Sequence, residues 1–144
     1  MTDVARGELT PFVHAANNRC FGCGPANPIG LHLEFLRAQD GTIVCQATIG
    51  ANFEGPPGYL HGGMIATLLD EAMSKAVRAL GVTAMTRHME VEYLRPVHSG
   101  VPIRIEGRLS RSEDRKHWAE AVVLAESGSK LAAAKGLFIE VKKR

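Results

Sequence analysis

Two glycines and an aspartate offer the clearest chemistry in this sequence. Gly62 and Gly63 follow His61 at the start of a segment with helical periodicity, and Asp70 lies nine residues after the histidine. The first N–H groups of a helix have no partner within it, so this glycine turn could hold a negative charge that develops on an oxygen atom. Asp70 falls at the margin of the apolar arc, where poor solvation raises the pKa of a carboxylate and makes it a stronger base or nucleophile.

The separation of these groups predicts that one chain cannot complete the site. Gly62 and Asp70 are roughly 12 Å apart along a helix that rises about 1.5 Å per residue, too far for both to reach one carbonyl group. If two copies place their helices antiparallel about a twofold axis, Gly62 of one copy meets Asp70 of the other. We therefore expect an obligate homodimer, with a homotetramer built as a dimer of dimers as the open alternative.

The sequence predicts strands both before and after the helix. Apolar residues recur at helical spacing from Met64 to Leu80, and Gly81 supplies a stop signal. Alternating apolar residues and turn signals predict a hairpin before the helix and an antiparallel meander after it. The predicted strands cover residues 31–36, 42–49, 84–97, 101–110, 117–126 and 130–141, and a loop rich in Gly and Pro fills residues 50–60.

These elements predict an α+β domain in which an antiparallel sheet of about six strands wraps around one long central helix. We expect residues 1–144 to form this single domain, with residues 1–30 as an irregular N-terminal lead-in rich in turn signals. The alanine-rich composition of the last two predicted strands would by itself also fit a helix.

The composition excludes several classes of protein. The 144 residues are 45% hydrophobic and 22% charged with a formal net charge of +2, which is typical of a folded soluble domain and not of a nucleic-acid-binding protein. The first nine residues have no apolar run, and no segment approaches the roughly 18 apolar residues of a membrane span. We therefore expect a cytoplasmic protein with no membrane partner.

Three cysteines, Cys20, Cys23 and Cys45, are an odd number in a chain without a predicted secretion signal, which favours reduced thiols over a disulfide framework. Cys20 and Cys23 have the spacing of a zinc or redox site, but the sequence offers no second CxxC or HxxxH motif to complete four ligands. We expect no metal and no cofactor, and we place Cys45 in the core. Glu71 is predicted to be a charge on the solvent side of the helix.

The segment from Gly58 to Ala72, which carries the HGG turn and Asp70, resembles the signature of the PaaI-like thioesterases within the 4-hydroxybenzoyl-CoA thioesterase superfamily. The run from Val91 to Pro96 after Thr86 is similar to the strand that follows the helix in this family. Cys20 to Leu31 is similar to a segment that a subset of the family carries. The resemblance implies a hotdog fold, a homodimer, and hydrolysis of an acyl-CoA thioester to free acid and coenzyme A without a cofactor.

The resemblance also implies roles for individual residues. Asp70 would be the general base or the nucleophile, and the Gly62 backbone N–H would polarise the thioester carbonyl. Thr86 would hold the carboxylate or a water, or it is an ordinary strand threonine. For His61 the expectation comes from the residue itself: a lone histidine is usually structural, so we expect it to bond the backbone and shape the turn, with general acid catalysis as the less favoured role.

Substrate contacts are expected from the glycine turn, the preceding loop and the basic rim that the phosphates of coenzyme A require. The predicted contacts are Gly63, Asn52, Glu54, Tyr59 and Arg95. The chain departs from the family at Gly55, where some relatives place an Asn or Gln that positions water. Asn52 and Glu54 are the nearby residues of suitable chemistry.

Three other functions remain open on sequence alone. The first is a non-catalytic acyl-CoA-binding module with the same hotdog dimer, which Gly55 motivates. The second is a hotdog hydratase, which the sequence disfavours because the helix and loop region holds no Asp-x-x-x-x-His pair. The third is a small metal or redox protein built on Cys20 and Cys23.

Overall fold

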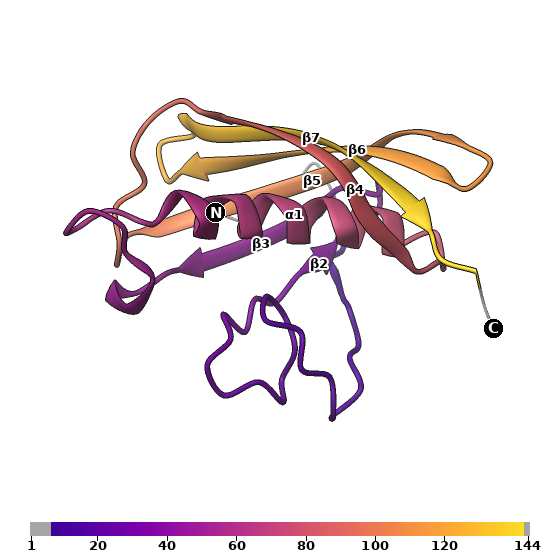
Figure 1. The fold of residues 1–144 in the computed structure, drawn as a ribbon, viewed down its shortest axis with the longest axis horizontal. Helices are drawn as coiled ribbons and strands as arrows, with labels where there is room; N and C mark the ends of the chain where they lie inside the picture. Colours follow the sequence, from indigo (N-terminus) through magenta and orange to yellow (C-terminus); the bar gives the residue numbers. More distant parts are fainter. Residues whose placement is uncertain (1–6, 143–144) are drawn as a thin grey trace.

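The computed structural model describes residues 7–142 and places one long helix across one face of an antiparallel sheet (Figure 1). The helix, α1, spans Gly62–Arg78 and follows a short 3₁₀ turn, η2, at Ala51–Phe53. The strands are β1 Thr10–Pro11, β2 Leu36–Arg37, β3 Ile43–Thr48, β4 Ala84–Tyr93, β5 Pro102–Glu113, β6 Lys116–Ala125 and β7 Lys130–Glu140.

The strands form one sheet in the order β1-β2-β3-β5-β6-β7-β4, with every neighbouring pair antiparallel. This confirms the predicted α+β arrangement of one sheet and one central helix. The sheet has seven strands where about six were expected, because the short β1 adds to its edge within the predicted lead-in. β4 lies at the opposite edge, where it pairs with β7 and ends the sheet among the described residues.

Small side chains on the sheet allow α1 to lie close to it. A Cβ at Gly107 of β5 would lie 2.6 Å from the carbonyl oxygen of Ala72, so no larger residue fits there unless the helix moves away. A Cβ at Gly136 of β7 would lie 3.2 Å from the Met73 side chain. The alanine-rich segments that by composition would also fit a helix are therefore strands, and their small side chains lie on the sheet face against which α1 packs. The buried ones in β6 and β7 are Ala119, Ala121, Ala132 and Ala134.

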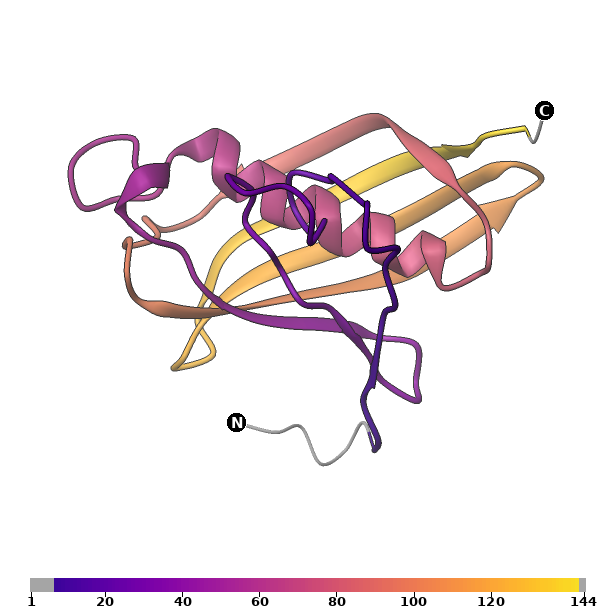
Figure 2. The same ribbon diagram turned by 90° about the horizontal axis from the view of Figure 1, so that it is seen from below.

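The helix contributes a continuous apolar face to this core. Leu68, Leu69 and Ala72 are fully buried against the sheet. Burying an apolar side chain of this size contributes roughly 1.5–3 kcal/mol for a leucine, so this face largely determines how α1 lies on the sheet. Figure 2 shows α1 between the sheet and the N-terminal segment, residues 10–35, which crosses the outer side of the helix.

Three predicted strand boundaries are wrong. The strand predicted over 84–97 ends early, because β4 stops at Tyr93 and the next two N–H groups both donate to the Leu131 carbonyl. Residues 31–35 form no strand, because the N–H groups of Leu31 and Leu33 donate to the carbonyls of Phe21 and Gly22 and not to a neighbouring strand. Leu33 is nevertheless buried, as its apolar pattern indicated. Only the end of the predicted strand survives, as β2, which pairs with β3.

The third error lies after position 110, where the predicted strand ended and the next strand was predicted to begin only at 117. β5 instead continues to Glu113, and the turn is confined to Asp114 and Arg115, with Asp114 at a positive φ of 54°. A register shift between Leu109 and Arg111 interrupts the apolar alternation, and this hid the end of the strand.

The ends of the chain are only partly covered by these observations. Residues 1–6 of the predicted lead-in and residues 143–144 lie outside the described residues. Within the described part, no helix combines the length and the apolar character that crossing a membrane requires.

Candidate active site

The turn before α1 leaves one backbone donor free. His61 is the N-cap, with φ −61° and ψ 136°, and its Nδ1 accepts a hydrogen bond of 2.8 Å from the Gly63 N–H. The N–H groups of Met64 and Ile65 donate to the His61 carbonyl at 2.9 and 3.1 Å. Among the described residues, the Gly62 N–H has no such partner, so it is the donor available to a ligand. Gly63 instead uses its N–H to hold the turn.

Tyr93 fixes the same turn from the sheet, a contact that sequence reasoning missed. Its hydroxyl donates to the Gly62 carbonyl at 2.8 Å, and its ring lies 3.7 Å from the point where a Gly62 Cβ would be. The alternation in β4 marked Tyr93 only as a strand residue. Its contact with a glycine 31 positions earlier depends on how the helix crosses the sheet, and no local pattern reports that.

Asp70, at the middle of α1, lies against Thr86, near the start of β4. The Thr86 hydroxyl donates to Oδ1 of Asp70 at 2.6 Å. Burial raises the pKa of the Asp70 carboxyl above its ordinary value, and the nearby Glu71 carboxylate adds to this rise. The Thr86 hydrogen bond opposes the rise because it favours the ionised form. The result is a half-buried carboxylate with one oriented oxygen and increased basicity.

The loop between η2 and α1 is tied to the segment after β4. Oε2 of Glu54 accepts a hydrogen bond from the Ser99 hydroxyl, and this bond, together with the Gly58 backbone, lowers the pKa of the Glu54 carboxyl. The Tyr59 ring lies against His98 with centroids 5.0 Å apart. These contacts give Glu54 and Tyr59 a role in positioning the loop that leads to His61.

The remaining predicted residues lie around this turn without contacts that assign them a role. Asn52 is exposed in η2, and Arg95 is exposed just beyond β4. At Gly55 an added Cβ would lie 3.2 Å from the Cα of His61, so the absence of a side chain there allows the loop to approach the glycine turn.

The residues thus form two halves on one helix. One half is the free Gly62 N–H held by His61 and Tyr93, and the other is Asp70 held by Thr86. Both halves lie on the same α-helix, eight positions and therefore roughly 12 Å apart, as the sequence predicted. No single carbonyl group can contact both within one chain.

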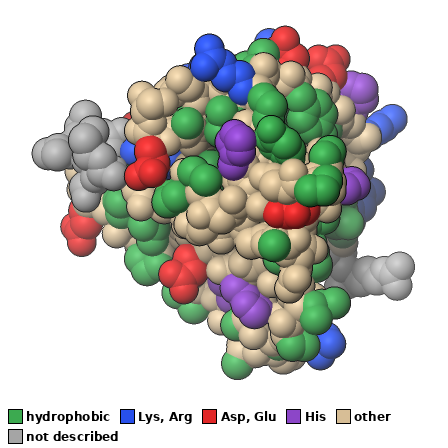
Figure 3. All heavy atoms as spheres, turned by 90° about the vertical axis from the view of Figure 1, so that its left-hand side faces the viewer, with side chains coloured by type: hydrophobic (Ala, Val, Ile, Leu, Met, Phe, Trp, Pro, Cys, Tyr) green, Lys and Arg blue, Asp and Glu red, His purple; other side chains and the backbone are tan. Residues whose placement is uncertain are grey.

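Figure 3 shows the end of the molecule where the 50–60 loop and the start of α1 lie. Backbone and other side chains make up most of this face, hydrophobic and His side chains are scattered over it with Asp and Glu side chains among them, and Lys and Arg side chains stand near its margin.

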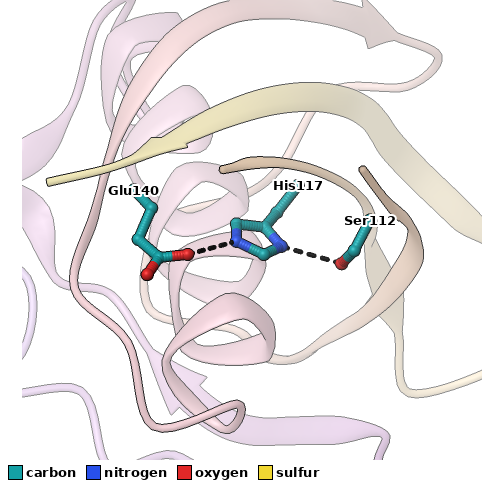
Figure 4. Close-up of polar contacts among 3 residues, drawn as sticks. All are labelled: Ser112, His117 and Glu140. Carbon is teal, nitrogen blue, oxygen red and sulfur yellow. Dashed lines mark hydrogen bonds and ion pairs between the residues drawn. The ribbon is translucent and has the colours of Figure 1, made fainter. Parts of the chain in front are cut away.

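A second polar cluster lies at the other end of the sheet (Figure 4). His117 Nδ1 lies 2.7 Å from the Ser112 hydroxyl, and its Nε2 lies 3.1 Å from a Glu140 carboxylate oxygen. The order of groups is that of a serine-hydrolase triad. Each residue lies on a different strand, and His117 is only 5% exposed, so we assign the cluster to holding β5, β6 and β7 together.

Comparison with curated proteins finds relatives that are named acyl-coenzyme A thioesterases. Residues 57–132, more than half of the chain, match the model of the thioesterase superfamily. The chain is 31% identical over 108 residues to an acyl-coenzyme A thioesterase THEM4 of Xenopus laevis, and 30% identical over 111 residues to acyl-coenzyme A thioesterase THEM5 of Homo sapiens. These matches cover 74% and 75% of this chain but 49% and 44% of the relatives, so the chain spans about half the length of the curated relatives it matches.

Solved structures of thioesterase superfamily proteins have the same fold as this chain. The thioesterase superfamily protein RHA08564 superposes with a TM-score of 0.79 at 27% identity, covering 86% of this chain and 60% of that one. The BH2602 protein of Bacillus halodurans, solved with CoA, gives 0.70 at 26% identity, covering 79% and 77%. The E. coli PaaI protein shares the fold, with 0.72 at 18% identity over 78% and 81%. The chain belongs to the thioesterase superfamily and has its hotdog fold.

Proposed function

We propose that this protein hydrolyses an acyl-CoA thioester to the free acid and coenzyme A at a site shared by two copies of the chain. The observation that supports this proposal most strongly is that α1 holds two separate groups suited to thioester hydrolysis. The free Gly62 N–H lies at the start of the helix, and the Asp70–Thr86 pair lies roughly 12 Å further along. The names of the curated relatives and the CoA in the BH2602 structure support this substrate class.

The chemistry follows from these two halves. The Gly62 N–H donates to the thioester oxygen, where negative charge develops as the carbonyl is attacked. Asp70 either removes a proton from the attacking water or attacks the carbonyl itself, forming an anhydride that water then opens. In both routes the carbon–sulfur bond breaks, and the thiolate of coenzyme A leaves and takes up a proton. Thr86 holds one carboxylate oxygen and leaves the other to react.

The position of β4 supports a shared site. Thr86 and Tyr93, which touch the two halves of the site, both lie on this strand. The register shift between Thr86 and His88 places Thr86 on the same face as Met89, Val91 and Tyr93, the face that packs toward the helix.

β4 also has a free edge among the described residues, and Met85 and Tyr93 on it are 64% and 54% exposed. If two copies of β4 pair antiparallel about a twofold axis at Glu90, and the extra residue at position 87 is skipped as it is in the pairing with β7, Thr86 of one copy lies opposite Tyr93 of the other. This pairing carries Asp70 to the partner's glycine turn. It makes two equal sites and extends the sheet from one copy into the next.

The test is release of free thiol across a panel of acyl-CoAs of different length and aromatic character, with Asp70→Asn assayed in parallel. The variant keeps the shape of the side chain and removes the base. We expect at least one acyl-CoA to be cleaved by the parent and not by the variant. Equal rates for the two proteins would refute the assignment, and binding in calorimetry without thiol release from any substrate would favour the non-catalytic binding module.

The dimer has its own test. Sedimentation should show at least a dimer at the concentration at which the activity is measured. A fully active monomer would exclude a site shared between chains.

A further inference from the structure

A cluster of metal-ligating groups lies on the outer side of α1, away from the proposed active site. The Sγ atoms of Cys20 and Cys23 and a carboxylate oxygen of Glu71 all lie within 4.8 Å of one another. The Cys20 thiol donates to Oε1 of Glu71 at 3.2 Å. Glu71 is thus half-buried against the N-terminal segment, and the prediction of a solvent-side charge is wrong.

The loop that carries the two cysteines is wound tightly and presents both sulfurs together. The Gly24 N–H donates to the Cys20 carbonyl at 2.8 Å, and the Cys20 N–H donates to the Asn18 side chain at 2.8 Å. A Cβ at Gly24 would lie 2.3 Å from the Cys20 nitrogen, so only glycine permits this turn. The backbone therefore prepares the thiol pair before any ligand binds.

The surroundings balance the charge that a divalent cation would meet. Lys75 Nζ lies 3.0 Å from Cys23 Sγ, and the two residues are 9% and 5% exposed. Two thiolates and the Glu71 carboxylate carry three negative charges, which a divalent ion and the Lys75 ammonium together neutralise. Lys75 can continue to donate to the Cys23 sulfur while that sulfur binds a metal.

We propose that Cys20, Cys23 and Glu71 bind one Zn²⁺ ion that fastens the N-terminal segment to α1. Two thiolates and a carboxylate are ligands that zinc accepts, and sulfur ligands disfavour Mg²⁺ and Ca²⁺. The fourth tetrahedral position falls to a water, for which the cavity of about 330 Å³ that these three residues line leaves room. The site is structural, and it does not depend on the proposed hydrolysis.

The sequence concealed this site because its third ligand is remote. Glu71 lies 51 positions after Cys20 and comes from the helix, where its neighbour Asp70 carries the candidate chemistry. The expectation of no metal rested on the lack of a second CxxC or HxxxH motif. The structure supplies a carboxylate in place of that second motif, because the N-terminal segment crosses α1 at this point (Figure 2).

The first test is the metal content of the full chain, purified without a histidine tag and exchanged into metal-free buffer. We expect about one zinc per chain in the parent, and almost none in Cys20→Ser or Cys23→Ser. Glu71→Gln should bind zinc more weakly against a competing chelator. The matched control is Cys45→Ala, because Cys45 is a buried cysteine in β3, and this variant should keep the zinc.

The second readout does not depend on how well each variant folds. In the parent, replacing zinc with Co²⁺ should give the charge-transfer absorption of thiolate ligands. A chelator should expose two more thiols to a thiol reagent and make the N-terminal segment easier to cleave by protease. A parent that binds no zinc after incubation with Zn²⁺, that keeps its zinc in both serine variants, or that holds Cys20 and Cys23 as a disulfide would overturn the proposal.

Discussion

Replacing Gly62 by proline isolates the contribution of one N–H group. Gly62 is the first residue of α1, a position at which proline fits because its φ suits a helix and its missing N–H has no partner within the helix. The residue before a proline must be extended, and His61 already is, with ψ 136°. The substitution therefore removes the proposed oxyanion donor while the backbone keeps its path.

The expected magnitude comes from what such a donor contributes. Removing one oxyanion-hole donor costs about 10²–10³ in kcat, or about 2.7–4 kcal/mol. Gly62→Ala is the matched control because it keeps the N–H and adds only a methyl group, which would lie 3.7 Å from the Tyr93 ring, an ordinary contact. We expect the alanine variant to stay within a few-fold of the parent.

The assay is kcat and KM from thiol release on the best acyl-CoA, with circular dichroism and sedimentation to show that both variants fold and assemble. The loss should fall mainly on kcat, because the donor acts most strongly on the charge of the transition state. If the proline and alanine variants have the same kcat, the Gly62 N–H does not polarise the carbonyl and the proposed site is wrong.

Three further predictions follow from Asp70, Thr86 and His117. Because burial raises the pKa of Asp70, the folded state holds this proton more tightly than the unfolded chain, and stability falls as pH rises from the ordinary aspartate pKa through the raised one. Asp70→Asn should therefore melt at a higher temperature than the parent at neutral pH, with the difference shrinking in acid; a lower melting temperature at neutral pH would contradict this. Activity should rise with pH as Asp70 ionises, and Thr86→Val should move that rise to higher pH because it removes the bond that lowers the pKa; an unmoved pH profile would show that the bond does not act on the base. His117→Leu should lower the free energy of unfolding in urea by about 1–2 kcal/mol, because Ser112 and Glu140 lose their shared partner; an unchanged midpoint would remove the cluster's assigned role.

Much of the fold follows from local pattern. The α1 periodicity and the alternation in β3 to β7 are signals that the packing reinforces, because most of the apolar positions they mark face one core. The segment from Leu31 to Phe35 shows where pattern fails. Its alternation reports burial, but burial under a loop and burial in a sheet give the same spacing, and only the backbone partners at Phe21 and Gly22 distinguish them.

The candidate site likewise has a part that local sequence patterns predict and a part that they do not. The glycine turn and Asp70 are close in sequence and carry a helix signal, so they could be predicted. Tyr93 and Glu71 act through contacts with residues 31 and 51 positions away, which are set by how β4 and the N-terminal segment cross α1. No short sequence motif indicates where two elements cross. The hydrogen bond from Tyr93 to the glycine turn and the cluster of two thiols with the Glu71 carboxylate could therefore be seen only in the structure.

The most direct test of a site shared between two copies is complementation between two inactive variants. Asp70→Asn and Gly62→Pro would carry different affinity tags and be co-expressed, and the mixed dimer would be isolated through both tags. In that dimer one site holds both substitutions and the other holds none, so the shared-site geometry predicts about half the activity of the parent dimer, while each variant alone stays inactive. A mixed dimer as inactive as the two single variants would show that Gly62 and Asp70 act within one chain.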